Sequence, residues 1–227
     1  MGQSMIHMHG ITKQYHTGAG PVPVLGEIDF QVAQGEFVAV MGPSGSGKST
    51  LLYLLGCLDR PSSGVYVLDG QDVSKASDRE LSHLRSRHIG FVFQTFHLLP
   101  DLDVFENVAL PFLYTPLLDV DPKACARRAI EKVGLRHRAH HFPSELSGGE
   151  MQRAAIARAL VVEPKMILAD EPTGNLDSET GREIIGLFQA LHDVGTTIIM
   201  VTHDREVAAC ARKVKVLKDG TFYLSVP

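Results

Sequence analysis

A glycine-rich segment at residues 42–50, with the sequence GPSGSGKST, combines the residue types that hold phosphate groups. Its glycines let the backbone wrap closely around an anion and point successive N–H groups inward. We expect Lys48 to reach the β- and γ-phosphates of a nucleotide and the Ser49 hydroxyl to bind Mg²⁺. The candidate phosphate-binding residues are Gly42, Pro43, Ser44, Gly45, Ser46, Gly47, Lys48, Ser49 and Thr50.

The sequence on both sides of this segment supports the same interpretation. The apolar run 37–41 (FVAVM) predicts a short buried strand before it, and residues 51–55 (LLYLL) predict a helix after it. Strand, glycine-rich loop and helix in this order form the context of a phosphate-binding P-loop, because the helix N-terminus adds unpaired N–H groups and a positive partial charge. A glycine- and serine-rich turn that contains GKS by chance is the competing interpretation, and it explains neither flank.

Two carboxylates follow a second apolar run within residues 165–177, KMILADEPTGNLD. Residues 166–169 predict a strand, so Asp170 and Glu171 stand at its carboxyl end, where open α/β sheets bind ligands. There Asp170 can hold Mg²⁺ against phosphates, and Glu171 can orient an attacking water or accept its proton. An Asp-Glu pair alone is more often a polar turn. Behind a complete P-loop in the same chain, the catalytic interpretation is favoured.

A third segment, residues 146–153 (LSGGEMQR), contains a second helix start suited to an anion. Ser147 and Glu150 have the spacing of a capping box and predict the start of a helix over residues 151–162. Gly148 and Gly149 at this start also make an anion-binding helix terminus. The chain therefore offers two helix starts where phosphate could dock, and the presence of the second needs an explanation.

Together these segments resemble the ATP-binding cassette (ABC) ATPases. GPSGSGKST is similar to their Walker A motif, MILADE to their Walker B motif with its catalytic glutamate, and LSGGE to their signature motif. Further positions in the family's order are Tyr15 as the adenine-stacking aromatic, Gln94 as the Q-loop, 175–177 as the D-loop and His203 as the switch histidine. The set extends from residue 15 to residue 203, so the resemblance covers nearly the whole chain.

The resemblance implies ATP as the nucleotide and Mg²⁺ as its ion. It assigns metal binding to Ser49, Gln94 and Asp170, activation of water to Glu171 and the γ-phosphate contact to His203. It also implies an ATP-bound homodimer, in which a second copy faces the P-loop with Ser147, Gly148, Gly149, Glu150 and Asp177. Glutamine is commoner than glutamate at position 150 in the family, and Glu150 adds a negative charge near a phosphate contact.

A finer resemblance is to the ABC branch that exports macrolides or releases lipoproteins from the inner membrane, and it rests on VPVL, LLYLLGCLDRPSSG, FVFQTFHLLP and ADEPTGNLD. It implies an integral-membrane permease as partner and a peripheral position at the cytoplasmic face of the inner membrane. Residues 96–100, just after Gln94, are the expected docking surface. Two other classes stay open: a soluble ABC-type ATPase acting on DNA or ribosomes, and a nucleotide-binding regulator without turnover.

We expect an α/β fold: a P-loop NTPase core with an N-terminal antiparallel β subdomain and an α-helical insertion. Residues 1–227 form one nucleotide-binding domain, in which 1–94 and 148–227 make the core with its β subdomain and 95–147 make the insertion. Strands are expected at 6–15 and 24–32, separated by a flexible break over residues 16–21. Helices are expected at 77–86, after a capping box, and at 121–133, with a proline in the first turn.

Composition narrows the classes of function. The chain has 227 residues and a formal charge of −4, which argues against broad nucleic-acid binding. Its cysteines, Cys57, Cys125 and Cys210, fit neither a disulfide framework nor a metal site, and they suggest a reducing cytoplasm. The first residues lack the pattern of a signal peptide, and no apolar run approaches the ~20 residues that span a bilayer. Histidines 137, 140 and 141 have no acidic or cysteine partner nearby and are not expected to bind metal.

Overall fold

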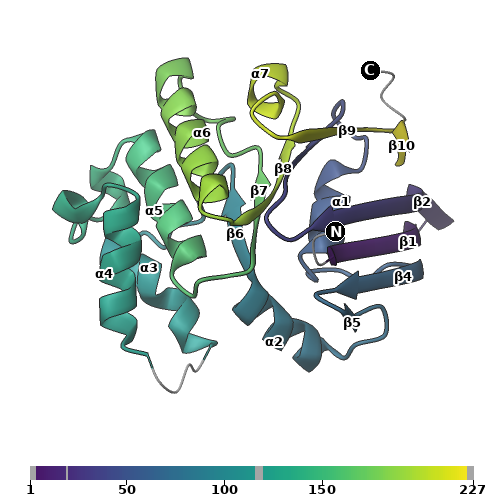
Figure 1. Ribbon diagram of the computed structural model, residues 1–227, viewed down its shortest axis with the longest axis horizontal. Helices are drawn as coiled ribbons and strands as arrows, with labels where there is room; N and C mark the ends of the chain where they lie inside the picture. The colour runs from purple at the N-terminus through teal and green to yellow at the C-terminus, as the bar shows by residue number, and fades with distance from the viewer. Residues whose placement is uncertain (1–3, 19, 116–119, 224–227) are drawn as a thin grey trace.

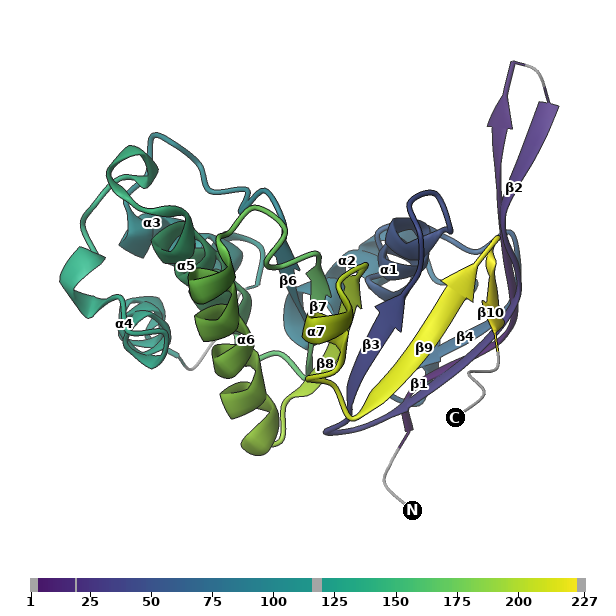
Figure 2. The same cartoon turned by 90° about the horizontal axis from the view of Figure 1, so that it is seen from above.

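The structure, a computed structural model, describes residues 4–18, 20–115 and 120–223. A mainly parallel six-stranded sheet runs through the middle, in the order β10-β9-β3-β8-β7-β6. An antiparallel sheet lies at one end of the molecule and a group of helices at the other (Figures 1 and 2). The strands of the parallel sheet are β3 (Phe37–Met41), β6 (Ile89–Phe93), β7 (Met166–Asp170), β8 (Thr197–Thr202), β9 (Lys213–Lys218) and β10 (Thr221–Tyr223).

The central strands are apolar throughout because both of their faces are buried. On β7, Met166 and Leu168 belong to a core cluster shared with the antiparallel sheet. Ile167 and Ala169, which point the other way, belong to a second cluster shared with the helices. The period of two along this strand therefore divides the interior into two layers, one on each side of the sheet.

The antiparallel sheet has four strands in the order β2-β1-β4-β5. Its strands are β1 (Ser4–Thr17), β2 (Gly20–Ala33), β4 (Ser63–Leu68) and β5 (Gln71–Asp72). The expected flexible break over residues 16–21 is wrong: His16 pairs with Pro21 and Thr17 with Gly20, so the hairpin continues to its turn. Several register shifts along β1 and β2 let the pairing absorb the irregular spacing of apolar residues. Ala19 lies outside the described residues.

Helices α1 (Lys48–Leu55), α2 (Asp78–His88), α6 (Ser178–Asp193) and α7 (Arg205–Ala208) follow strands of the two sheets. The capping box predicted before α2 is confirmed, because the Ser77 hydroxyl accepts from the Glu80 N–H and the Glu80 carboxylate accepts from the Ser77 N–H. A capping side chain also starts α6: the Asp177 carboxylate accepts from the N–H groups of Glu179 and Thr180. Such caps satisfy helix-start N–H groups that have no partner within the helix.

The helical end of the molecule contains α3 (Val104–Ala109), α4 (Pro122–Lys132) and α5 (Gly148–Leu160), with short 3-10 turns between them. Helix α4 starts after Asp121, whose carboxylate accepts from the Lys123 N–H, with Pro122 in the first turn. Buried alanines and isoleucines of α4 and α5 belong to the second core cluster. Residues 116–119 of the predicted insertion lie outside the described residues.

Candidate active site

The carboxyl ends of four neighbouring parallel strands meet at one edge of the sheet. The glycine-rich loop follows β3, Gln94 follows β6, Asp170 ends β7 and His203 follows β8. A cavity of about 660 Å³ opens at this edge. It is lined by Val24, Pro43, Ser44, Gly45, Gly47, Lys48, Ser49, Thr50, Gln94, Asp170, Glu171 and His203. We call this cavity the nucleotide cleft; its position is the one that open α/β sheets use for ligands.

The glycine-rich loop is folded into a closed cradle. Gly45 and Gly47 have φ values of 78° and 96°, a backbone conformation that other residues rarely adopt. The Lys48 ammonium bridges the loop by donating to the carbonyls of Gly42 and Pro43, at 2.9 Å each. The Ser46 hydroxyl is buried and has no hydrogen-bond partner among the described residues. Loop and helix α1 thus present N–H donors and a lysine around a space that suits phosphate oxygens.

Asp170 lies at the base of the cleft beside the helix start. Burial and the neighbouring charge of Glu171 raise the pKa of this carboxyl, while Lys48 and a hydrogen bond from Ser49 act to lower it. A carboxylate with a raised pKa and a hydroxyl beside it form a site that gains from a cation. The donor set of one carboxylate and one hydroxyl also fits Mg²⁺, which usually binds through one or two carboxylates together with substrate phosphates and waters.

Glu171 turns toward the cleft because its backbone is left-handed, with φ at 45°, and its N–H donates to the Val201 carbonyl at 2.9 Å. Its carboxylate Oε1 lies 2.8 Å from the His203 Nδ1. The His203 backbone N–H also donates to Oε2 of the same carboxylate at 3.4 Å. The Glu171 side chain is 17% exposed and that of His203 is 70% exposed, so the histidine stands at the mouth of the cleft.

Gln94 is held by Asn175, the first residue of the D-loop segment 175–177. The Gln94 amide donates to the Asn175 side-chain oxygen at 3.0 Å, and the Asn175 amide donates to the Gln94 carbonyl at 3.0 Å. A Cβ on Gly174 would meet the Gln94 amide nitrogen at 2.6 Å, so a larger residue there would displace the Gln94 side chain. The segments after β6 and β7 are thereby joined next to the cleft.

Tyr15 does not line the cleft. Its ring is 38% exposed, its hydroxyl donates to the Asp59 carboxylate at 2.8 Å, and the Lys13 ammonium lies 4.7 Å from the ring centroid. Burial and the Asp59 carboxylate raise the pKa of Tyr15, while a hydrogen bond with Thr50 lowers it. Because Thr50 itself lines the cleft, Tyr15 stands at the rim of the cleft.

The signature residues also lie outside the cleft, at the start of α5. Gly149 is packed against α6, where a Cβ would meet the Thr180 methyl carbon at 2.4 Å. Gly148 approaches Leu176 of the D-loop, 3.2 Å from an added Cβ. Ser147 caps α5, and Asp177 caps α6. The starts of α5 and α6 thus lie against each other, and none of Ser147, Gly148, Gly149 and Asp177 lines the cleft of the same chain.

Glu150 is neutralised within its own chain. Its carboxylate accepts from the Ser147 N–H at 2.8 Å and from the Arg138 guanidinium at 2.9 Å. The hydrogen bond from the Ser147 backbone and the Arg138 charge keep the pKa of Glu150 below its usual value. Arg138 therefore offsets the negative charge that Glu150 adds to the signature motif. No local pattern links the two residues, since Arg138 lies on a 3-10 turn outside the motif.

The fold and the cleft define a P-loop nucleotide hydrolase with two carboxylates at the end of β7. Residues 25–174 match the family model described as ABC transporter. The chain belongs to the ABC transporter family and is an ATP-binding, ATP-hydrolysing subunit of that family.

Some relatives of this chain have about the same length, and others are much longer. The uncharacterized ABC transporter ATP-binding protein YknY of Bacillus subtilis is 52% identical over 216 residues, 95% of this chain and 94% of that protein. Macrolide export ATP-binding/permease protein MacB 2 of Aeromonas hydrophila is 47% identical over 220 residues. These are 97% of this chain but 34% of that protein, so the chain spans about a third of its length.

Solved structures share the fold. The chain resembles the ATP-binding cassette MJ0796, in a dimeric post-hydrolysis state bound to ADP and Pi, with a TM-score of 0.89 and 40% identity. This match covers 97% of both chains. A second dimeric structure of MJ0796, described as a bacterial ABC transporter cassette, has the same TM-score with 41% identity. The expected fold class, a P-loop core with an antiparallel β subdomain and helical parts, is confirmed.

Proposed function

We propose that this chain hydrolyses MgATP between two copies of itself and so drives a separate membrane permease. Within one copy, Lys48 and the N–H groups of the loop bind the phosphates, while Ser49, Asp170 and Gln94 hold the metal. When bound, Mg²⁺ supplies positive charge that offsets the charge on the phosphates. Glu171 orients the attacking water and takes its proton, and His203 contacts the γ-phosphate. Tyr15 stacks on the adenine at the rim of the cleft.

The observation that carries the two-copy proposal is the separation of two phosphate-binding helix starts. Helix α1 begins in the nucleotide cleft, whereas none of the residues Ser147, Gly148, Gly149, Glu150 and Asp177 lines it. A head-to-tail pair related by a two-fold axis brings the start of α5 of each copy to the P-loop of the other, and it completes two sites at once. The dimeric state of the similar cassette MJ0796 supports an assembly of two copies.

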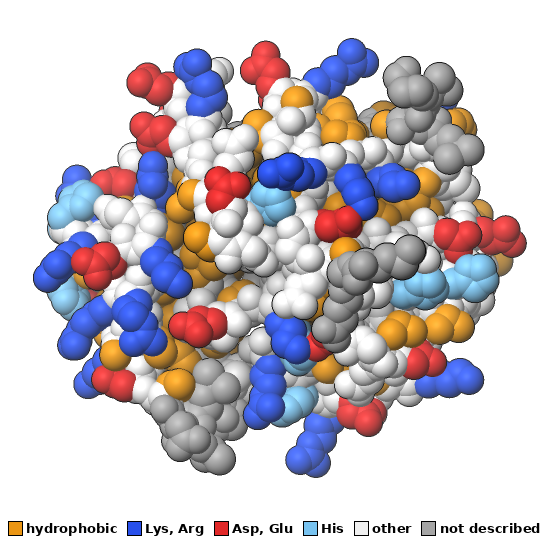
Figure 3. Space-filling view, in the orientation of Figure 1, with side chains coloured by type: hydrophobic (Ala, Val, Ile, Leu, Met, Phe, Trp, Pro, Cys, Tyr) orange, Lys and Arg blue, Asp and Glu red, His pale blue; other side chains and the backbone are white. Residues whose placement is uncertain are grey.

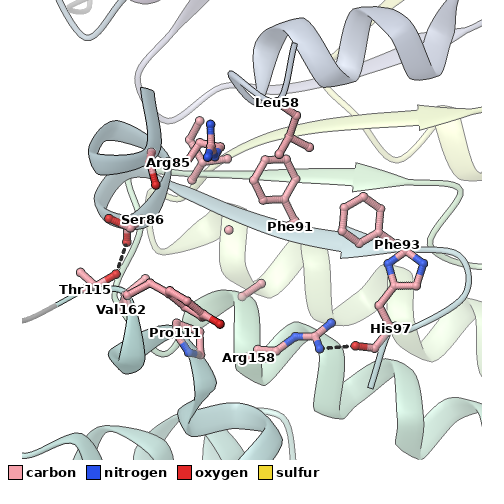
Figure 4. A pocket seen from close by; sticks show the side chains of 15 residues that line it. Leu58, Arg85, Ser86, Phe91, Phe93, His97, Pro111, Thr115, Arg158 and Val162 are labelled. Atoms are coloured by element: carbon pink, nitrogen blue, oxygen red, sulfur yellow. Dashed lines mark hydrogen bonds between the residues drawn. The ribbon is translucent and has the colours of Figure 1, made fainter. Parts of the chain in front are cut away.

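A second cavity, of about 530 Å³, supports the proposed permease partner (Figure 4). It lies between the core and the helical end, and we call it the docking groove. The Phe91 and Phe93 rings of β6 line it and stack with centroids 5.7 Å apart. On the opposite wall Thr115 donates to the Ser86 carbonyl at 3.2 Å. An apolar groove with aromatic walls suits a short amphipathic helix of a partner.

The groove and the nucleotide cleft are joined through the chain itself. Phe93 lines the groove and the next residue, Gln94, lines the cleft. Beyond them, the Arg158 guanidinium donates to the carbonyls of His97 and Phe96, the latter at 2.7 Å, and so fixes the turn after Gln94. A partner helix in the groove would therefore press on the segment that places the Gln94 amide.

Only part of the docking surface expected at residues 96–100 lines the docking groove. His97 lines it, whereas Leu98 packs against the core cluster of the helical end. Tyr114, 78% exposed, adds an aromatic side chain at the groove.

No helix of the described ranges 4–18, 20–115 and 120–223 is long and apolar enough to cross a membrane. We place the chain at the cytoplasmic face of the inner membrane, with a permease of the macrolide-efflux, peptide-efflux or lipoprotein-release type.

Copurification from detergent-solubilised membranes tests the partner. The tagged chain should retain a membrane-spanning protein, and Tyr114→Glu should lose it while keeping the solution ATPase rate. Tyr223→Glu is the matched control, because Tyr223 is 49% exposed on β10, at the opposite end of the molecule (Figure 1). Retention of the membrane protein by Tyr114→Glu would place docking elsewhere. Recovery of DNA or ribosomes in place of a membrane protein would favour the soluble class of ABC ATPase.

A further inference from the structure

The segment 122–141, which includes α4, carries a charge opposite to that of the chain. It contains six Lys and Arg residues and one carboxylate, that of Glu131, whereas the whole chain has a formal charge of −4. Figure 3 shows Lys, Arg and His side chains gathered at the side of the molecule where α4 lies in Figure 1. The nucleotide cleft and the docking groove use none of these residues.

A cavity of about 370 Å³ opens in this basic surface, and we call it the α4 cavity. Phe105 of α3, Ile130 of α4 and Ala139 give it an apolar lining. Lys123, Arg127, Arg136 and His140 line it with positive or titratable side chains, and Glu131 is its acidic lining residue. Glu131 lies 3.4 Å from the Arg136 guanidinium, and His140 lies 3.0 Å from the Asp103 carboxylate, so both acidic groups have partners.

Lys123 and Arg127 are exposed and stand one helical turn apart on α4. Neither side chain has an ion-pair or hydrogen-bond partner within the described part of the chain, although both line the cavity. Two unpaired cations beside an apolar floor match a ligand with a phosphate group attached to an apolar body.

We propose that the α4 cavity binds the headgroup of an anionic phospholipid at the membrane surface. Its volume suits a single headgroup, whereas a nucleic-acid strand needs a continuous basic track. The choice of lipid over free phosphate rests on the proposed function, which places the chain beside a permease. The basic surface would then orient a chain that is acidic as a whole against an anionic leaflet.

Flotation with vesicles tests this site on the full chain. The chain should bind phosphatidylcholine vesicles that contain about one-third phosphatidylglycerol, and not phosphatidylcholine alone. The double substitution Lys123→Ala/Arg127→Ala should weaken binding by about 30-fold, since each cation near the surface contributes about fivefold. The matched control is Arg128→Ala/Lys132→Ala, which removes the same charge from α4 outside the cavity and should weaken binding by less than about threefold.

Several outcomes would overturn the proposal. Equal losses in both double variants would show a diffuse electrostatic effect rather than a site. Equal binding to neutral vesicles would remove the role of phosphate charge. Tight binding of inorganic phosphate, or of a DNA duplex, with the same dependence on Lys123 and Arg127 and without vesicle binding would assign the site to another ligand. Failure of the proposed function would appear separately, as lost ATPase activity or an absent permease, because neither double variant touches the cleft.

Discussion

His203 Nδ1 lies 2.8 Å from Glu171 Oε1 at the mouth of the nucleotide cleft. The pairing of β7 with β8 creates this contact, since it places Asp170 opposite Val201 and so brings the two strand ends together. In the proposed mechanism, binding of a γ-phosphate at His203 would release this carboxylate oxygen to an attacking water. We therefore propose that His203 couples nucleotide binding to water activation.

His203→Ala should lower kcat for ATP about 100-fold while leaving ATP affinity within about threefold, since removal of one group that acts in the transition state costs this much. Phosphate release under saturating MgATP and equilibrium nucleotide binding are the two measurements. His137→Ala is the control, because that histidine is exposed on a distant 3-10 turn. A His203→Ala enzyme with full turnover would remove His203 from the reaction.

Lys48→Ala should abolish turnover and weaken ATP binding by about 100-fold, the loss expected for a charge-assisted contact to phosphate. The substitution also removes the two hydrogen bonds to Gly42 and Pro43 that bridge the loop. Titration calorimetry with ATP, with Lys75→Ala as an exposed control, measures the effect. Near-normal ATPase activity in Lys48→Ala would refute the phosphate-binding assignment of the loop.

The raised pKa of Asp170 has a consequence for stability. Its ionised form is disfavoured in the folded chain by burial and by Glu171, so folding becomes less favourable as pH rises from about 4 toward the folded pKa. Asp170→Asn should therefore raise the melting temperature at neutral pH, by about 2–4 °C per kcal/mol, and abolish Mg²⁺-dependent turnover. The gain should vanish near pH 4. An unchanged or lower melting temperature at neutral pH would contradict this account.

Asp59 serves as a control because its pKa is shifted in the opposite direction to that of Asp170. Burial acts to raise its pKa, but hydrogen bonds from Lys13 and Tyr15 outweigh burial and lower it. This carboxylate stabilises the folded chain above its unfolded pKa, and that contribution is lost as pH falls through the lower folded value. Asp59→Asn should accordingly lower the melting temperature at neutral pH, because it leaves the Lys13 ammonium, 10% exposed, without its carboxylate at 2.6 Å.

Glu150 tests whether a negative charge at the signature motif matters. Glu150→Gln keeps a side chain that can accept from the Ser147 N–H, so stability and ATPase rate should change little. Glu150→Ala removes the carboxylate that accepts from the Ser147 N–H and from Arg138, and it should cost about 1 kcal/mol of unfolding free energy. Denaturant titration of both variants makes the comparison. Equal destabilisation by glutamine and alanine would show that the charge at position 150, and not its hydrogen bond with the Ser147 N–H, is what stabilises this helix start.

Local patterns were enough to predict where the candidate residues of the cleft lie in the fold. The spacing of Lys48 and Ser49 behind an apolar strand placed them at a helix start, and Asp170 and Glu171 were correctly expected at a strand end. Capping boxes at Ser77 and Ser147 were also predicted correctly, because a cap is decided by residues three positions apart. All of these depend on contacts within one short segment.

Contacts between segments that are distant in the chain could not be predicted from the sequence. Asn175 bonds Gln94 across 81 positions, and Arg158 reaches the Phe96 carbonyl across 62, so no periodicity reveals either pair. The hairpin at His16 and Pro21 was predicted as a flexible break because its glycines and proline favour turns, yet strand pairing extends through them. His140 was expected to lack an acidic partner, but Asp103 lies 37 positions upstream and meets it in the fold.

The central claim is that ATP joins two copies of this chain, and Glu171→Gln tests it most directly. This substitution keeps the shape of the side chain and removes the carboxylate that would take a proton from water, so ATP should bind without being consumed. Light scattering coupled to gel filtration with saturating MgATP should then show a dimer, which reverts to monomer when Ser147 is also replaced by arginine. A Glu171→Gln chain that remains monomeric with ATP bound would contradict the account.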